Sequence, residues 1–258
     1  MSALALLGAL FACVFVGLAS ALMGLGGGMF MVPLLDLIPG VSWQEAAATS
    51  LTCALATSAA GSVAFDKGKL ADLELVVLLE LSGTVGALVG AAVLATIVPE
   101  RVSAGVFSAL VAYAAWKMVR RRQDAKEEPQ PEGPVEHLGL GIAGAGVAGI
   151  LSGLLGIGGG PVKVPLQTEL CRIPLKVALA NSNLMVGITA GVGAAVYFAM
   201  GVVLAHLIAP CAIGIALGAY LGGLLMPKLP VARLRAGFVV VLLVLLGRML
   251  WKTLGLGS

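Results

Sequence analysis

Two clusters of glycine are the residues in this sequence best placed to bind a small anion. Residues 24–28 read Gly-Leu-Gly-Gly-Gly and residues 156–160 read Gly-Ile-Gly-Gly-Gly, and a proline follows each cluster, at positions 33 and 165. This pattern predicts a broken helix, and a helix that restarts after a break directs free N–H groups and the positive end of its dipole at the gap. The backbone could then bind an anion through Gly26, Gly27, Gly28, Gly158, Gly159 and Gly160.

The same glycines have a simpler explanation in close helix packing, because small residues let two backbones approach each other. For one cluster alone, packing is the better interpretation. Two clusters at equivalent positions favour a binding site. A dinucleotide-binding turn is excluded, because that turn needs a preceding strand and an acidic residue about 20 positions later, whereas long apolar blocks surround both clusters.

Two charged residues fall inside apolar stretches. Lys163 follows the second glycine cluster, where the first cluster is followed by Met31. A charge at membrane depth is costly, so it usually marks a site, an ion-pair partner or a side chain that reaches the interface. We predict that Lys163 contacts the anion, with an escape to the interface as the alternative. Glu80 could neutralise Lys163, carry a proton for coupled transport, or lie near the interface.

Short polar side chains gather early in the apolar block that follows each glycine cluster. Their hydroxyl and amide groups could donate hydrogen bonds to an oxyanion, or they could bond to neighbouring helices, as is common in membrane bundles. Their position beside the glycine clusters favours binding. The residues are Thr49, Ser50, Asn181, Ser182 and Asn183.

No residue pattern in the sequence indicates catalysis, a metal site or a cofactor. There is no Ser-His-Asp or paired-carboxylate arrangement, and the four cysteines are scattered through apolar stretches, where we expect them to pack as small hydrophobic residues. We therefore expect no enzyme, no cofactor, no metal and no nucleic-acid partner. The expected partners are a small anion and the lipid bilayer, and an oligomer is compatible with the sequence.

The composition places these residues in a membrane. Of the 258 residues, 59% are hydrophobic and 11% are charged, whereas a soluble domain carries about 25% charge. The apolar blocks match the roughly 20 residues of one helical crossing. We predict an all-α, multi-pass protein of the cell membrane, expected to be the cytoplasmic membrane of a prokaryote. Eight crossings are predicted, the first of each half being glycine-broken or re-entrant: 3–23, 45–65, 73–98, 102–119, 138–155, 177–200, 203–226 and 231–254.

The sequence repeats at an offset of 132 positions (156 minus 24), which indicates an internal duplication. The offset that superposes the glycine clusters also carries Ser20 onto Ser152. We predict two homologous transmembrane halves, 1–119 and 138–258, joined by a polar linker at 120–137. Duplicated halves that enclose a central site are typical of transporters.

The orientation of the halves stays open at this point. The basic run Arg120-Arg121-Arg122 predicts a cytoplasmic linker by the positive-inside rule. Eight full crossings would give both halves the same orientation. A first segment that re-enters the membrane would change the parity and allow inverted halves.

The motifs quoted above resemble those of the TauE/SafE family of membrane transporters for sulfite, thiosulfate and organosulfonates. The resemblance rests on Gly-Leu-Gly-Gly-Gly-x-x-x-Val-Pro from Gly24, Gly-Ile-Gly-Gly-Gly-Pro-Val-Lys-Val-Pro from Gly156, and the later segments 46–51 and 180–183. It covers essentially the whole chain. It implies transport of a small sulfur-containing anion, with the glycine clusters and the polar residues after them in the site.

These observations together predict a secondary membrane transporter that binds a small sulfur-containing anion between its two halves. An anion channel and a transporter of another small organic anion, such as a carboxylate, are the alternatives. A membrane-embedded scaffold or enzyme is a further alternative, for which the sequence shows neither a partner-binding domain nor a catalytic constellation; this alternative and the channel both rank well below transport.

Overall fold

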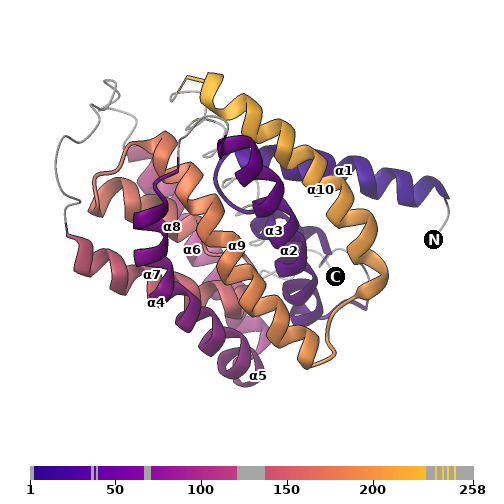
Figure 1. The fold of residues 1–258 in the computed structure, drawn as a ribbon. Coiled ribbons are helices and arrows are strands. Elements are labelled where there is room, and N and C mark those ends of the chain that lie inside the picture. Colours follow the sequence, from indigo (N-terminus) through magenta and orange to yellow (C-terminus); the bar gives the residue numbers. More distant parts are fainter. Residues whose placement is uncertain are drawn as a thin grey trace.

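The structure, a computed structural model, is a bundle of packed α-helices (Figure 1). It describes residues 3–230 except 36–37, 39, 67–70 and 121–136, and beyond these only residues 236, 240, 243 and 247. The described residues contain no strand, which confirms the all-α class. The predicted crossing at 231–254, apart from those four residues, and positions 121–136 of the predicted linker lie outside the described residues.

On each side of the linker the helices begin with a long, a short and two further long helices, with a π-helix added after the short helix of the second set. The first set is α1 (Ala3–Leu22), α2 (Gly28–Leu35), α3 (Trp43–Asp66), α4 (Leu73–Val89), the π-helix η1 (Gly90–Leu94), α5 (Ala95–Ile97) and α6 (Glu100–Arg120). The second set is α7 (Leu138–Leu155), α8 (Gly160–Pro165), the π-helix η3 (Leu166–Leu170), α9 (Leu175–Ala199), α10 (Ala205–Leu225) and the 3₁₀ turn η4 (Met226–Lys228).

Five helices of the described residues are long and apolar enough to cross a membrane, which supports a multi-pass membrane protein. They are Trp43–Phe65, Leu73–Ile97, Leu138–Leu155, Leu175–Ala199 and Ala205–Lys228.

Helix boundaries follow local sequence signals. Ser42 and Glu45 form a capping box before α3, in which the Ser42 N–H donates to the Glu45 carboxylate at 2.8 Å. The Asp72 carboxylate accepts the Leu75 N–H at 3.1 Å at the start of α4. Both glycine clusters break the chain as predicted: φ lies between 62° and 80°, values that glycine adopts at little cost, at Gly24, Gly26, Gly27, Gly156, Gly158 and Gly159.

Helices α3 and α9, which begin 132 positions apart, run antiparallel. The Leu51 side chain lies beside Gly193, whereas Ser58, further along α3, lies beside Gly187, earlier in α9. Residue numbers therefore rise along one helix while they fall along the other.

The remaining contacts fix the directions of the other long helices. Helix α1 runs parallel to α10, because Leu10 lies beside Gly214 and Leu18 beside Gly222. Helix α4 runs parallel to α7 in the same way, through contacts of Gly83 with Gly149 and of Gly90 with Ile150 and Leu154. Helix α10 runs parallel to α3, because Thr49 bonds to Leu204 and Gly61 lies beside Gly223. Helix α4 runs parallel to α9, because Asp72 bonds to Asn181, and Lys163 bonds to both Glu80 and Thr189. Each of α1, α3 and α4 therefore runs opposite to the helix 132 positions later.

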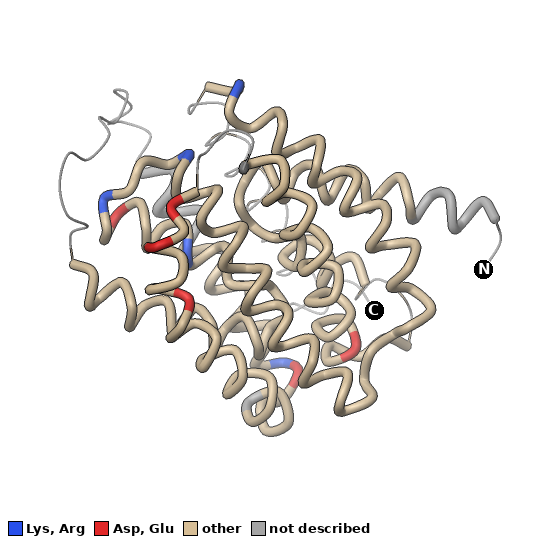
Figure 2. Tube along the Cα trace, viewed as in Figure 1, with Lys and Arg blue, Asp and Glu red and all other residues tan. Residues whose placement is uncertain are grey.

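Charged residues lie mainly at the two ends of the bundle (Figure 2). The end at which α4 and α9 begin carries basic and acidic residues of the elements that start or finish there: Asp72, Glu74, Glu169, Arg172, Lys176 and Lys228. The opposite end, at which α3 and α6 begin, carries Glu45, Glu100 and Arg101. Most of the described basic residues thus gather at one end.

Glycines bring the parallel pairs into backbone contact. In α7, a Cβ on Gly149 would overlap the carbonyl group of Gly83, and in α1 a Cβ on Gly17 would overlap the carbonyl group of Ile215. Such approach is how small residues hold membrane helices together, since lipid offers no hydrophobic drive for helix association.

We predict that Gly149→Ala destabilises the protein by about 1–3 kcal/mol, because the added methyl group has no room in this interface. Gly105→Ala in α6 is the matched control, since its Cβ would meet no atom within 4 Å. Thermal unfolding in detergent measures both. Equal midpoints for the two variants would show that the α4–α7 contact is looser than described.

Candidate functional site

The two glycine breaks pack against each other in the buried centre of the bundle. A Cβ on Gly28, the first residue of α2, would lie 2.6 Å from the Gly156 carbonyl oxygen. A Cβ on Gly160, the first residue of α8, would lie 2.7 Å from the Cα of Leu25. Each short helix therefore begins where the chain of the opposite half breaks.

The breaks lie near the middle of the long helices. Gly26 and Gly158 both contact the side chain of Val186, about halfway along α9. From this point α2 runs toward the end at which α3 and α10 begin, where Leu35 packs in one cluster with Leu207. The segment after α8 runs toward the opposite end, where Ile173 clusters with Leu75. The N-terminal ends of two short helices thus meet in the protein interior, an arrangement that favours negative charge.

Two serines cross-link the breaks. The Ser50 hydroxyl lies 2.8 Å from the Gly156 carbonyl oxygen and 2.9 Å from that of Gly28, and it can donate its proton to either. The Ser182 hydroxyl, 132 positions later, donates to the Gly24 carbonyl at 2.8 Å. Each serine thus satisfies a carbonyl group that the other half's break has left without a helical partner.

Thr49 and Asn181 also form hydrogen bonds to the half of the chain in which they do not lie. The Thr49 hydroxyl oxygen accepts the Leu204 N–H at 3.1 Å, just before α10, and the Asn181 side-chain oxygen accepts the Asp72 N–H at 2.8 Å, just before α4. Each predicted binding residue therefore holds the start of a helix in the opposite half.

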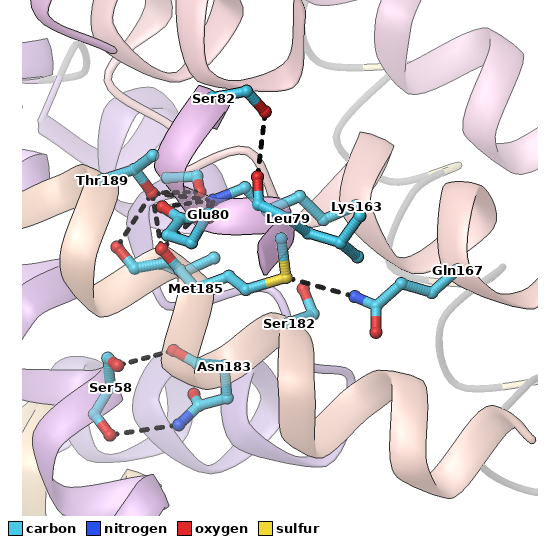
Figure 3. Close-up of polar contacts among 12 residues, drawn as sticks. Ser58, Leu79, Glu80, Ser82, Lys163, Gln167, Ser182, Asn183, Met185 and Thr189 are labelled. Atoms are coloured by element: carbon cyan, nitrogen blue, oxygen red, sulfur yellow. Dashed lines mark hydrogen bonds and ion pairs between the residues drawn. The ribbon is translucent and has the colours of Figure 1, made fainter. Parts of the chain in front are cut away.

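Asn183 joins α9 to α3 (Figure 3). Its side-chain Nδ2 donates to the Ser58 backbone carbonyl at 3.0 Å and to the Ser62 hydroxyl at 3.2 Å. The Ser58 hydroxyl donates to the Asn183 backbone carbonyl at 2.5 Å. All five predicted polar residues therefore make the interhelical bonds that were the alternative interpretation, and an anion contact by them stays a prediction.

Lys163 and Glu80 form an ion pair in the interior (Figure 3). The Lys163 side chain is completely buried, and its ammonium lies 2.8 and 3.1 Å from the two Glu80 carboxylate oxygens. It also donates to the Met185 carbonyl at 3.1 Å and to the Thr189 hydroxyl at 2.9 Å. Of the roles left open for Glu80, neutralisation of Lys163 is the one that the geometry shows, and neither residue reaches the interface.

The first half carries no charge at the equivalent place. Met31 occupies the position that corresponds to Lys163, and Ala212 of α10 the position that corresponds to Glu80. Met31 belongs to a buried apolar cluster with Cys13, Cys53 and Cys211. Three cysteines that are distant in sequence are thus brought together as packing residues, on the side of the centre that lacks the ion pair.

Two buried serines were not predicted as site residues. The hydroxyls of Ser20 and Ser152, completely buried, have no hydrogen-bond partner. They occupy equivalent positions four residues before each glycine cluster. Ser152 is near Lys163, because a Cβ on Gly159 would lie 3.5 Å from the Ser152 Cβ and 3.2 Å from the Lys163 Cε. Their repetition at the 132-residue offset was the signal that could have identified them.

A cavity of about 180 Å³, lined by both polar and apolar residues, opens near the start of α3. Ser42, Trp43, Glu100 and Ser103 line it, and it reaches Leu154, two residues before the second glycine cluster. The buried Trp43 indole N–H has no hydrogen-bond partner. The cavity therefore lies near the second break, at the end of the bundle where α3 begins.

The sequence model of the family described as "Sulfite exporter TauE/SafE" matches residues 9–249. The probable membrane transporter protein YunE of Bacillus subtilis is 29% identical over 229 residues, which are 80% of this chain and 82% of that protein. A probable membrane transporter protein of Haemophilus influenzae is 29% identical over 68% of this chain and 65% of its own length. The probable membrane transporter protein MamO of Magnetospirillum gryphiswaldense is 40% identical over 38% of this chain, which is 16% of its own length. No solved structure matches the chain.

We predict that the ion pair behaves as a unit in unfolding experiments. Lys163→Met or Glu80→Ala alone should each cost about 3–5 kcal/mol, because each leaves one buried charge without its partner. The double variant copies Met31 and Ala212 of the other half and should be more stable than either single variant. Chemical unfolding in detergent measures the cycle, and additive effects would contradict a coupled pair.

Proposed function

The chain belongs to the TauE/SafE sulfite exporter family of membrane transporters, and on that basis we propose that it is a secondary transporter of a small sulfur-containing anion. Sulfite, thiosulfate and organosulfonates are the proposed substrate class. The substrate binds between the two halves, where the glycine breaks meet beside Lys163.

The convergence of two helix N-termini on a buried interior is the observation that carries this proposal. Gly28 and Gly160 begin α2 and α8 in contact with the opposite break, and Lys163 follows Gly160 within the same turn. N–H groups and a cation attract an anion from two sides. A sulfur oxyanion has several acceptor oxygens, so it can use several converging donors at once, including the unpartnered Ser152 hydroxyl.

We also propose that the two halves are inverted repeats of five passes each, the glycine-broken segment being the second pass. The antiparallel course of α3 and α9 supports this arrangement, as do the opposite directions taken by α2 and α8. Alternating access then follows when one half moves against the other around the central site. Each half then has an odd number of passes, whereas eight full crossings give each half an even number. The difference arises because the broken segments, with only short helices, cross from one face of the membrane to the other.

The distribution of basic residues predicts how the molecule is oriented in the membrane. Arg172, Lys176 and Lys228 lie at one end, and α6, which starts at the opposite end, finishes at Arg120, where the sequence continues into the basic linker. The positive-inside rule places this end in the cytoplasm. The cavity beside Trp43 then opens away from the cytoplasm.

Inverted halves predict that equivalent positions lie on opposite faces. Glu74 and His206 are exposed and 132 positions apart, so Glu74→Cys should react with a membrane-impermeant maleimide only after cells are permeabilised, and His206→Cys in intact cells. The four native cysteines are buried, which keeps the background low. Labelling of both from the same side would exclude inversion.

The substrate class is tested by thermal unfolding of the detergent-purified protein with sulfite, thiosulfate, taurine, sulfate, lactate and chloride. A ligand that binds only the folded protein stabilises it by about 2.7 kcal/mol at a concentration of 100 Kd. We expect a selective rise with a sulfur anion, reduced in Lys163→Gln but retained in Lys228→Gln, which removes an exposed charge.

Saturable flux in proteoliposomes would then separate a transporter from a channel. A rise with lactate alone would favour a carboxylate substrate, and no rise or flux with any anion would overturn the proposal.

A further inference from the structure

The Lys163 ammonium has no hydrogen left for a substrate in the state described here. An ammonium carries three N–H donors. Four acceptors lie within 2.8–3.1 Å of it: both Glu80 carboxylate oxygens, the Met185 carbonyl and the Thr189 hydroxyl. An anion can bond to Lys163 only by taking the place of one of these acceptors. An anion fits best in the place of Glu80, because Glu80 is the negatively charged acceptor of the four.

Charge balance makes this exchange costly unless another charge moves with the anion. Lys163 and Glu80 are together neutral, so an added anion would leave the buried site with a net negative charge, which the protein interior and the bilayer strongly disfavour. A proton that enters with the anion and neutralises Glu80 removes this cost.

Lys163 is the only titratable group that contacts Glu80 among the described residues. Helix α7 and the π-helix η1, both packed against α4, contain no titratable residue. Helix α9 contains Lys176 and Tyr197, whose polar groups bond to the Pro227 and Gly153 carbonyls. Asp72 and Glu74 of the α4 region lie at its first turn. The other half offers Met31 and Ala212 at the equivalent positions.

We propose that the protein moves one proton with each anion, and that Glu80 carries it. When the anion replaces Glu80 on Lys163, the Glu80 carboxylate takes a proton from the side on which the anion entered and becomes a neutral acid. When the anion leaves on the other side, Glu80 releases the proton there and pairs again with Lys163, which stays charged throughout. This inference rests on the proposed function. A monovalent anion then crosses without net charge, and a divalent anion carries one negative charge.

The surroundings of the pair support such an exchange. Gly83 lies beside Glu80, where a Cβ would lie 3.0 Å from a carboxylate oxygen, so a side chain at this position would crowd the carboxyl group. The unpartnered Ser152 hydroxyl, across Gly159 from Lys163, supplies a donor to the incoming anion. The position of Lys163 four residues after Gly159 holds its ammonium by the second break.

The test uses proteoliposomes that contain a trapped pH dye and the purified full chain. Isethionate serves as the monovalent probe and thiosulfate as the divalent one, because neither changes its charge near neutral pH, whereas sulfite would carry a proton itself. We expect one proton to enter with each anion of either kind. A pH gradient alone should accumulate isethionate, and a clamped membrane potential should affect thiosulfate flux but not isethionate flux.

Glu80→Gln separates the proton from the anion. We expect isethionate flux to persist with proton entry lost and to become sensitive to the membrane potential, while Glu74→Gln, an exposed change on the same helix, behaves as the wild type. Glu80→Asp keeps a titratable group and should retain coupling with a shifted pH profile, which provides the comparison if Glu80→Gln does not fold.

The outcomes are distinct. Anion flux in the wild type without proton entry would overturn proton coupling and leave the proposed function standing, and coupled flux that survives in Glu80→Gln would remove Glu80 as the carrier. No flux of either probe, with no binding of any sulfur anion, would overturn the proposed function and this inference with it.

Discussion

A helix that breaks inside a membrane must have its exposed backbone groups covered by protein, and the rest of this structure follows from that requirement. Each half breaks at its glycines, and the opposite half covers the break. Ser50 bonds to the Gly156 carbonyl and Ser182 to the Gly24 carbonyl, while Gly28 and Gly160 leave room for the opposing backbone. The centre is therefore irregular in backbone yet closely packed, which is the condition under which a polar site can exist at this depth.

The two glycine breaks have different side chains beside them. The second half has Lys163 paired with Glu80, and the first has Met31 and Ala212 in an apolar cluster with three cysteines. Because the backbone of both breaks offers similar N–H groups, the ion pair is what distinguishes the two sides.

Much of the fold could be predicted from the sequence, because apolar blocks of membrane length and glycine clusters are local signals. The breaks, the long helices and the family were found in this way. The relative direction of the two halves could not be predicted, since it depends on whether the broken segments cross the membrane. No residue near Gly28 indicates whether they do. The sequence also could not predict the hydrogen-bond partners of Thr49, Ser50, Asn181 and Ser182. A hydroxyl or amide residue gives the same sequence signal whether its partner is a ligand or the backbone of a distant helix. Burial of Lys163 beside Glu80 required the packing of α4 against α9, which spacing along the chain does not reveal.

The exchanged hydrogen bonds also have a consequence for synthesis of the chain. Ser50 waits 106 residues for Gly156, Thr49 waits 155 for Leu204, and Gly24 waits 158 for Ser182. At about 5–20 residues per second, the Gly24 carbonyl of the first break spends on the order of 10 s without its Ser182 partner. Throughout that interval, the interior of the insertion machinery or its water must solvate this carbonyl, so the ribosome's pace through α7 to α9 becomes part of how the protein reaches its native state.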